Sequence, residues 1–173
     1  MVGFMGAGKS TVGRALGKYL GWAFEDLDER IELDQGRLIA EIFSAKGEAE
    51  FRRLETEALR ILLQELTDGG NRVIGLGGGA FVQAQNAALL KEAGVHTVFL
   101  NAPPEELWRR CVEQTAQAGI SRPLLQSFEQ FHALFLSRQE SYEKASIHVA
   151  TKGREVDAIA QEISEMIVQK KLR

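Results

Sequence analysis

The stretch MVGFMGAGKST (residues 1–11) contains a phosphate-binding loop of the form G-x-x-x-x-G-K-[ST], made by Gly3, Gly8, Lys9 and Ser10. Backbone N–H groups of such a turn, with the positive end of the following helix, form a concave site for phosphates. Lys9 is expected to reach the β- and γ-phosphates, and Ser10 to bind Mg²⁺. The pattern predicts binding of ATP or GTP, although a glycine-rich turn without a ligand stays open at this point.

Only Met1 and Val2 precede this loop, which normally follows a buried strand. Neighbouring strands of a parallel sheet need that strand on both of its edges. Without it, we expect unpaired backbone groups that cost about 1–3 kcal/mol each. The first strand is therefore expected to be truncated, and the chain as given to begin within it.

Composition and charge narrow the class of protein. The chain has 173 residues, 45% of them apolar, which fits one packed domain over residues 1–173. Its 21 Lys and Arg against 24 Asp and Glu give a net charge of -3, so neither nucleic acid nor a membrane is an expected partner. The single cysteine, Cys111, excludes an internal disulfide, and no apolar run reaches the ~20 residues of a membrane span. We expect a cytoplasmic monomer.

Predicted strands alternate with predicted helices along the whole chain, which favours a parallel sheet covered on both faces. Ligands bind at the carboxyl ends of the strands in such sheets. The predicted strands are 22–26, 72–76, 95–101 and 146–151, and a polar stretch at 113–123 interrupts the pattern. The predicted helices are 10–20, 28–43, 48–66, 84–92, one from 103 through Arg110, 127–142, and a last one with apolar residues from Val156 to Ile167.

Asp26 and Asp28 lie two residues apart at the end of a predicted strand, so both side chains point to the same side. Such a pair suits a phosphotransferase, in which one carboxylate holds a metal ion through water and the other accepts a hydrogen bond from the attacking hydroxyl. The alternative is that Asp28 only caps the next helix while Asp26 is solvated.

Several arginines are candidates for anion binding. Arg52 and Glu55 share a helix face, although surface ion pairs would give the same spacing. Arg138 projects from the aromatic side of its helix, where a substrate carboxylate is a suitable partner for the guanidinium group. Arg122 lies in the irregular stretch before Pro123, where a flap could bring it to the transferring phosphoryl group.

Together these residues resemble the shikimate kinases. The matching segments are GFMGAGKSTVGRALG at the loop, DLD after the second strand, GEAEFRRLE on the long helix, GLGGGA after the third strand, SRPLL in the flap and SRQESY on the helix after it. The resemblance implies a three-layer α/β/α fold like that of nucleoside-monophosphate kinases, with a five-stranded parallel sheet. It also implies a substrate-binding segment at about 28–60 and a lid at about 111–125.

The resemblance also implies site residues, carried over by position. It assigns the ATP phosphates to the loop, the metal to Ser10 and Asp26, the acceptor hydroxyls to Asp28, and the acceptor carboxylate to Arg52 and Arg138, supported by Glu55. Arg110 would lie near the adenine and Arg122 near the transferring phosphate. The loop residues are Gly6, Ala7, Gly8, Lys9, Ser10 and Thr11, backbone contacts come from Gly78 and Gly79, and the apolar wall is Ile39, Phe43, Phe51, Pro123 and Leu124.

The implied activity is transfer of the γ-phosphoryl group of ATP, with one Mg²⁺ ion, to the 3-hydroxyl of shikimate in aromatic amino-acid biosynthesis. Lys9, Asp28 and Arg122 are the expected catalytic residues. A related kinase for another hydroxylated acid, such as gluconate, is one alternative, and a catalytically silent nucleotide-binding relative is another. The stretch between Arg110 and Arg122 is longer than is typical of the family, so the adenine and lid contacts are the least defined.

Overall fold

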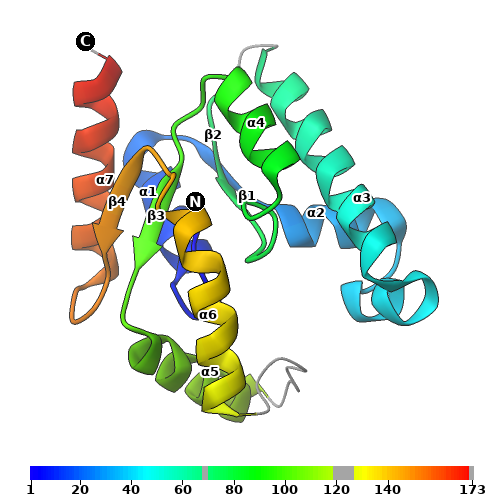
Figure 1. Cartoon of the computed structure of the whole chain (residues 1–173). Coiled ribbons are helices and arrows are strands. Elements are labelled where there is room, and N and C mark those ends of the chain that lie inside the picture. Colours follow the sequence, from blue (N-terminus) through cyan, green and yellow to red (C-terminus); the bar gives the residue numbers. More distant parts are fainter. Residues whose placement is uncertain (68–69, 119–126, 172–173) are drawn as a thin grey trace.

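The computed structural model describes residues 1–67, 70–118 and 127–171 (Figure 1). Within these ranges, helices alternate with short strands, as the sequence predicts for an α/β protein. None of the described helices combines the length and apolarity that a membrane span requires. The elements are α1 (Lys9–Leu20), β1 (Ala23–Asp26), α2 (Leu27–Gln35), α3 (Ile39–Thr67), β2 (Arg72–Gly75), α4 (Ala84–Glu92), β3 (Val98–Asn101), α5 (Pro104–Ala118), α6 (Phe128–Tyr142), β4 (Ile147–Ala150) and α7 (Val156–Lys171).

The strands form two parallel pairs. β1 pairs with β2, with Phe24 opposite Val73, and β3 pairs with β4, with Phe99 opposite His148. Because the strands of each pair run in the same direction, their carboxyl ends lie at the same edge, and the loops that follow them can share a site.

Met1 and Val2 lie between these two pairs and join them. Met1 bonds to the segment of β2, and Val2 forms a parallel bridge to Phe99 and bonds to the segment of β3. These two residues thus pair four backbone groups of the segments on either side of them, namely Ile74 O, Leu76 N, Val98 O and Leu100 N. The four hydrogen bonds run from Met1 N to Ile74 O (2.6 Å), Leu76 N to Met1 O (3.0 Å), Val2 N to Val98 O (2.8 Å) and Leu100 N to Val2 O (3.0 Å).

The expectation of a five-stranded sheet is therefore corrected for the described residues. They form two two-stranded parallel sheets, with the Met1–Val2 stretch in the place between them. The physical reason is that Gly3, with φ of 145°, already turns the backbone out of the strand direction and into the phosphate-binding loop. Met1 and Val2 are too short to form a strand of their own.

Helix α1 packs closely on β1, beside α7 (Figure 1). A Cβ atom at Gly13 would come 2.3 Å from the ring of Phe24, and one at Gly17 would come 2.6 Å from the carbonyl oxygen of Trp22. The absence of side chains at these two glycines therefore allows α1 to lie close to β1. Close contact here fixes the start of α1, which carries the phosphate-binding residues.

Aromatic packing fixes α6 against the loop and β3. The rings of Phe131 and Phe135 stand edge-on to Phe4, with centroids 5.0 and 5.5 Å away, and Tyr142 stacks on Phe99 at 5.4 Å. Figure 1 shows β3 and β4 between α6 and α7. This packing holds the side of α6 that bears Arg138 toward the phosphate-binding loop.

Several predicted boundaries differ from the structure. The predicted continuous helix over 28–43 is wrong, because Gly36 takes a left-handed conformation (φ 59°) and ends α2. The predicted break between residues 43 and 48 is confirmed, since Gly47 is non-helical inside α3. The predicted strand at 95–101 is shorter, with β3 beginning at Val98. In the stretch 113–123, the described part through Ala118 continues α5.

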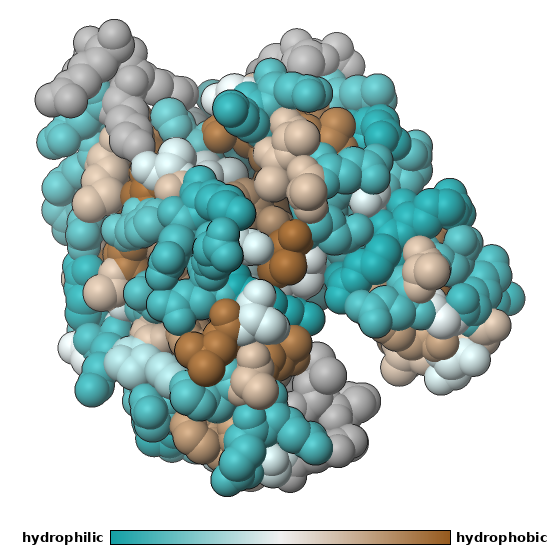
Figure 2. All heavy atoms as spheres, viewed as in Figure 1, coloured by the Kyte–Doolittle hydropathy of each residue, from teal (hydrophilic) through white to brown (hydrophobic). Residues whose placement is uncertain are grey.

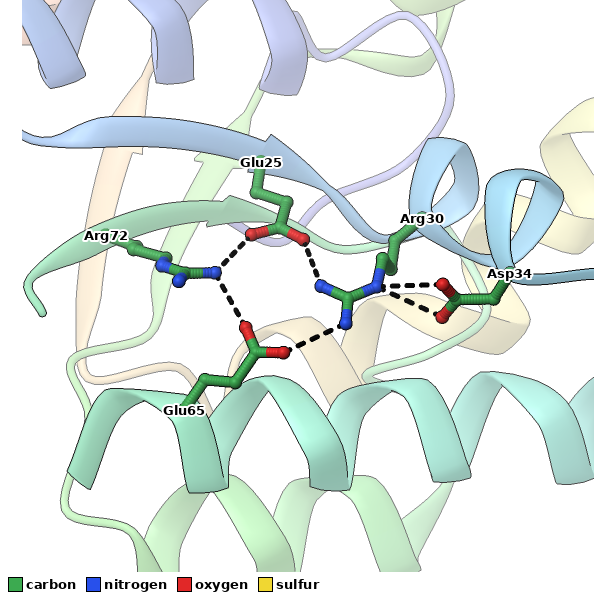
Figure 3. Close-up of polar contacts among 5 residues, drawn as sticks. All are labelled: Glu25, Arg30, Asp34, Glu65 and Arg72. Atoms are coloured by element: carbon green, nitrogen blue, oxygen red, sulfur yellow. Dashed lines mark hydrogen bonds and ion pairs between the residues drawn. The ribbon is translucent and has the colours of Figure 1, made fainter. Parts of the chain in front are cut away.

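A closed ring of charged side chains ties α2 and α3 to the β1–β2 pair (Figure 3). Arg30 donates to Glu25 (2.8 Å), Glu65 (2.9 Å) and Asp34 (3.0 Å), and Arg72 donates to the same Glu25 and Glu65 (2.7 and 2.8 Å). Arg30 beside it holds the pKa of the Glu65 carboxyl below its usual range. Networks of this kind hold elements in one geometry better than isolated surface pairs.

Replacing Arg30 by methionine keeps the aliphatic part of the side chain and leaves Glu25, Asp34 and Glu65 with Arg72 as the remaining cation of the ring. We expect a melting temperature lower by about 2–4 °C at low salt, and a smaller loss at about 1 M salt, where charges are screened within about 3 Å. Thermal unfolding monitored by circular dichroism measures both. Arg53→Met, which removes an exposed pair with Glu50, is the control, and an equal loss in both variants would contradict a special role for the ring.

Candidate active site

A hollow of about 570 Å³ lies at the carboxyl ends of β1 and β2, where the phosphate-binding loop meets α2 and α3. Figure 2 shows the molecule indented between the lobe formed by α2 and the first part of α3 and the part formed by α5 and α6. The lining of the hollow includes residues from the phosphate-binding loop and from α2, α3, α5 and α6. The lining residues are Met5, Gly6, Gly8, Lys9, Ser10, Thr11, Asp26, Asp28, Ile39, Phe43, Phe51, Arg52, Glu55, Leu76, Gly77, Gly78, Gly79, Gln114 and Arg138.

The phosphate-binding loop has the geometry of an anion site. Gly6 and Gly8 have backbone φ angles of 79° and 89°, which residues other than glycine rarely adopt. Gly8 stands before the first turn of α1, where no side chain caps the helix, so backbone N–H groups at this end are available to a ligand. Lys9 folds back over the loop, and its Nζ donates to Gly3 O (3.0 Å) and Phe4 O (3.2 Å).

Asp26 connects the loop to α2. Its Oδ2 accepts a hydrogen bond from the Ser10 hydroxyl (2.8 Å), and its Oδ1 accepts one from the Asp28 backbone N–H (3.1 Å). Asp26 is therefore the residue that caps α2. The alternative considered from sequence, in which Asp28 caps the helix and Asp26 is solvated, is wrong.

Asp28 presents an unusual carboxylate to the hollow. Its Oδ1 is buried and has no hydrogen-bond partner among the described residues. Burial, and then the neighbouring Asp26, raise the pKa of this carboxyl, while Lys9 and Arg52 act in the opposite direction. A buried carboxylate oxygen without a donor carries a desolvation cost, which a ligand hydroxyl that reached it would relieve.

Arg52 lies beside Gly79 of the glycine triplet, which consists of Gly77, Gly78 and Gly79, and is held by two carboxylates. Its Nη1 donates to Glu55 (2.8 Å) and its Nη2 to Glu48 (3.1 Å). Glu55 is 1% exposed, and burial raises the pKa of its carboxyl against the lowering effect of Arg52. A Cβ atom at Gly79 would lie 2.5 Å from Nη1 of Arg52. The close approach of the guanidinium therefore requires glycine at that position.

Arg138 faces the same hollow from α6. Its guanidinium lies 5.8 Å from the centroid of the Phe4 ring, and a Cβ atom at Gly78 would lie 3.5 Å from its Nη1. Among the described residues, no carboxylate forms an ion pair with Arg138. Arg138 thus brings a cation without a carboxylate partner among the described residues into the hollow that Arg52 also lines. The two arginines come from different helices, α6 and α3.

The apolar wall and the glycine triplet complete the site. Ile39, Phe43 and Phe51 line the hollow, and the rings of Phe43 and Phe51 lie 4.7 Å apart. A Cβ atom at Gly77 would come 2.6 Å from Asp28 Oδ1. A side chain at Gly77 would therefore collide with the carboxylate of Asp28, which belongs to the same site.

Five carried-over residues do not line the hollow or lie outside the described residues, and they are Ala7, which is buried, Arg110, Arg122, Pro123 and Leu124. Arg110 is not part of the lining, because it donates to Thr151 Oγ1 (3.2 Å) and Thr151 O (3.1 Å) and pairs with Glu106 (2.8 Å). Its Nη1 also lies 3.5 Å from Gly6 O, behind the loop. Arg122, Pro123 and Leu124, with most of the expected lid, lie outside the described residues.

Several further residues at the site were not predicted from sequence, among them Tyr142, Gln114 and Gln83. The buried Tyr142 hydroxyl donates to the Gly78 carbonyl oxygen, and burial raises the pKa of Tyr142 to about 12. Its spacing of four from Arg138 was a usable signal, since it places both on one helix face. Gln114 lines the hollow, and Gln83 bonds to Glu55. No local sequence pattern points to either glutamine.

Comparisons with known proteins agree on one family. The family model for shikimate kinase matches residues 5–168. A shikimate kinase of Geobacter metallireducens is 41% identical over 95% of this chain and 88% of its own length, and one of Streptomyces coelicolor is 43% identical over 93% and 90%.

Solved structures give the same result. Shikimate kinase from Acinetobacter baumannii in complex with shikimate is 35% identical with a TM-score of 0.82, covering 99% of this chain and 93% of that one. Shikimate kinase from Aquifex aeolicus is 34% identical with a TM-score of 0.83, covering 99% and 96%. A gluconokinase from Sinorhizobium meliloti, at 16% identity and a TM-score of 0.53 over 98% and 94%, shares the P-loop kinase fold.

The raised pKa of Asp28 makes a prediction about stability. The unfolded chain ionises this carboxyl near pH 3.9, whereas the folded chain does so only at higher pH, so Asp28 lowers stability as the pH rises through its folded pKa. Asp28→Asn should therefore raise the melting temperature at pH 7, and the gain should shrink as the pH falls toward 4.

Scanning calorimetry across this pH range measures the effect. Asp157→Asn, at an exposed position in the first turn of α7, serves as the control. A pH-independent difference between Asp28→Asn and the parent chain would show that burial of the Asp28 charge does not cost stability.

Proposed function

This chain belongs to the shikimate kinase family, and we propose that its hollow holds ATP and shikimate side by side for direct phosphoryl transfer. The chain is an ATP-dependent kinase whose acceptor is a hydroxyl of shikimate. The observation that carries the residue assignments is the meeting of three features at one site. These are a phosphate-binding loop, a buried carboxylate oxygen on Asp28 and two arginines, Arg52 and Arg138.

The loop is proposed to hold the ATP phosphates. Backbone N–H groups from Gly6 to Thr11 surround them, and Lys9, which now bonds to loop carbonyls, turns toward the β- and γ-phosphates when ATP binds. Arg110 is proposed to contribute near the adenine from its position beside Gly6 and Thr151. The support for this assignment is the contact between Arg110 and Gly6 of the loop, because Arg110 does not line the hollow.

The residues present also suit one Mg²⁺ ion. The Ser10 hydroxyl and the Asp26 carboxylate lie 2.8 Å apart at the phosphate end of the hollow. No cluster of three or more potential metal-binding His, Cys, Asp or Glu side chains occurs in the described part of the chain. That agrees with Mg²⁺, which keeps several waters and is held by one or two protein oxygens together with substrate phosphates. When bound, the ion neutralises phosphate charge.

Shikimate is proposed to bind across the hollow. Its carboxylate lies between Arg52 and Arg138, supported by Glu55 and by backbone groups of Gly78 and Gly79, because a guanidinium group matches a carboxylate in two-point geometry. The Asp28 carboxylate then accepts hydrogen bonds from ring hydroxyls at the opposite end, facing the loop. Its buried Oδ1 without a protein partner supports this role.

Catalysis in this arrangement rests on positioning and electrostatics. Asp28 orients the 3-hydroxyl toward the γ-phosphate and can accept its proton, since burial has raised its pKa above the usual range of a carboxyl. Lys9 stabilises negative charge on the transferring group. Arg122, outside the described residues, is proposed to close over the same group with a lid at about 111–125.

We assign all of these parts to one domain, residues 1–173, with residues 28–60 as the substrate-binding segment. Every proposed contact to both substrates comes from a single chain, which supports a monomer. Because the reaction consumes ATP, the proposed location is the cytoplasm.

An acceptor panel tests the proposed function directly. ADP release from ATP and Mg²⁺ is measured with shikimate, gluconate or a nucleoside monophosphate as the acceptor, and with Mg²⁺ removed by chelation. We expect ADP release when shikimate is the acceptor and none with gluconate or the nucleoside monophosphate. Removal of Mg²⁺ by chelation should abolish the release seen with shikimate. A folded sample that binds ATP but does not turn over shikimate would overturn the proposal, and turnover with gluconate instead would assign the acceptor differently.

Arg138→Ala tests the carboxylate clamp. Loss of a charged, paired contact to the substrate should raise the KM for shikimate about 10–100-fold while the KM for ATP changes little. Steady-state kinetics with each substrate varied in turn measures both constants. The control is Arg53→Ala, because Arg53 lies beside Arg52 but points outward into a pair with Glu50. Equal increases in both KM values would refute the clamp.

A further inference from the structure

Gln83 bonds to the buried carboxylate that holds Arg52. Its Nε2 donates to Glu55 Oε2 at 2.6 Å, and the same oxygen accepts the bond from Arg52 Nη1 at 2.8 Å. Gln83 precedes α4 at the position where a side chain would normally cap the helix, yet it makes no cap bond. Its amide is directed to Glu55 instead, 28 residues earlier in the chain.

Glu55 depends on these two donors because it is almost completely buried. A buried carboxylate keeps its charge only where donors and cations compensate for lost water. The charged groups that face it are Arg52 on its own helix α3, Asp28 on α2 and Arg138 on α6. Gln83, preceding α4, adds a neutral donor, which supports the carboxylate without consuming the charge of either arginine.

The two oxygens of Glu55 face different parts of the site. A Cβ atom at Gly77 would lie 3.1 Å from Glu55 Oε1 and 2.6 Å from Asp28 Oδ1, so Oε1 is on the side of the second carboxylate. Oε2 faces Arg52 and Gln83. Rotation of the Glu55 carboxylate would break both contacts of Oε2, and the bond from Gln83 opposes that rotation.

Arg52 also has an alternative partner outside the site. Its Nε and Nη2 donate to Glu48 Oε1 at 3.2 and 3.1 Å, and the Glu48 side chain is 67% exposed. If Glu55 lost its charge or turned away, Glu48 would be the remaining carboxylate partner of Arg52. The guanidinium would then be free to move toward solvent, away from the face of Gly79.

We propose that Gln83 is a positioning residue for substrate binding, which holds the Glu55 carboxylate against Arg52 and so keeps the guanidinium turned toward the acceptor carboxylate. This inference rests on the proposed function and adds to it a residue outside the substrate contacts. It predicts that the affinity for shikimate, rather than the affinity for ATP, depends on the Gln83 amide.

Gln83→Leu removes the donor while keeping a side chain of similar length. We expect the KM for shikimate to rise about 3–10-fold at pH 7.5 with the KM for ATP unchanged, which is the size of one ordinary lost hydrogen bond, since Gln83 acts on the substrate only through Glu55 and Arg52. The matched control is Gln161→Leu on α7, which removes the amide that donates to Glu165 on an exposed helix face. The control should leave both KM values unchanged.

The pH dependence separates positioning from simple loss of packing. Without its Gln83 donor, Glu55 takes up a proton at higher pH, so the rise of the shikimate KM on acidification should begin at higher pH in Gln83→Leu than in the parent chain. In a Glu55→Gln background, Gln83→Leu should produce no such shift, because the titrating group has been removed. Gln83→Ser, too short to reach Glu55, should behave like Gln83→Leu.

The results distinguish this inference from the proposed function. The role of Gln83 alone is overturned if the parent chain turns over shikimate and both Gln83→Leu and Gln83→Ser keep its shikimate KM and its pH profile. Equal changes in the KM of both substrates also overturn it. A parent chain without shikimate turnover removes the proposed function and this inference together.

Discussion

Four backbone hydrogen bonds from Met1 and Val2 hold the two pairs of strands together, and the rest of the site depends on them. On one side Met1 bonds to the segment of β2 that leads into the glycine triplet, and on the other Val2 bonds to the segment of β3. Buried backbone groups that lack partners cost about 1–3 kcal/mol each. The same two residues lead directly into the phosphate-binding loop, so the pairing that joins the sheets also fixes where the loop begins.

With the loop fixed there, the site acquires a charge distribution that is unfavourable without ligands. The carboxylates of Asp28 and Glu55 are buried near one another, and burial raises the pKa of each. Lys9 and Arg52 compensate in part, as they lower the pKa of Asp28. Binding sites commonly keep such costs because the same groups bind a ligand more strongly than they bind one another. In the proposed complex, the acceptor hydroxyls would satisfy Asp28 and the acceptor carboxylate would satisfy Arg138.

Local patterns in the sequence predicted the features that depend on local chemistry. The glycines and Lys9 define the loop, and the apolar periodicity locates the helices. Asp26 and Asp28, which were expected to face one side, both line the hollow. The meeting of Asp28 with Arg52 and Arg138 was implied by the resemblance to the shikimate kinases, because helical spacing alone left surface ion pairs open for Arg52. The roles of these residues stay proposals, whereas their placement around one hollow is observed.

The remaining features depend on contacts between distant residues. Arg110 bonds to Thr151 and Gln83 to Glu55 across 41 and 28 residues, and no periodicity encodes such partners. The ring around Arg30 likewise joins four elements. Gly36 is a residue type that commonly ends a helix, but the apolar residues beyond it favoured the prediction of a longer helix. In the structure Gly36 adopts the left-handed conformation and ends α2.

The two arginines of the proposed clamp are held in different ways, and this difference bears on how the acceptor is recognised. Arg52 is already paired with Glu55 and Glu48, so its charge is largely balanced within the protein and its main contribution is geometry. Arg138 has no ion-pair partner among the described residues and rests against Phe4, so its charge is available to a ligand. A carboxylate placed between them would gain most of its Coulombic attraction from Arg138 and most of its orientation from Arg52. An acceptor without an anionic group would leave Arg138 unpaired beside an apolar ring, which disfavours neutral polyols at this site.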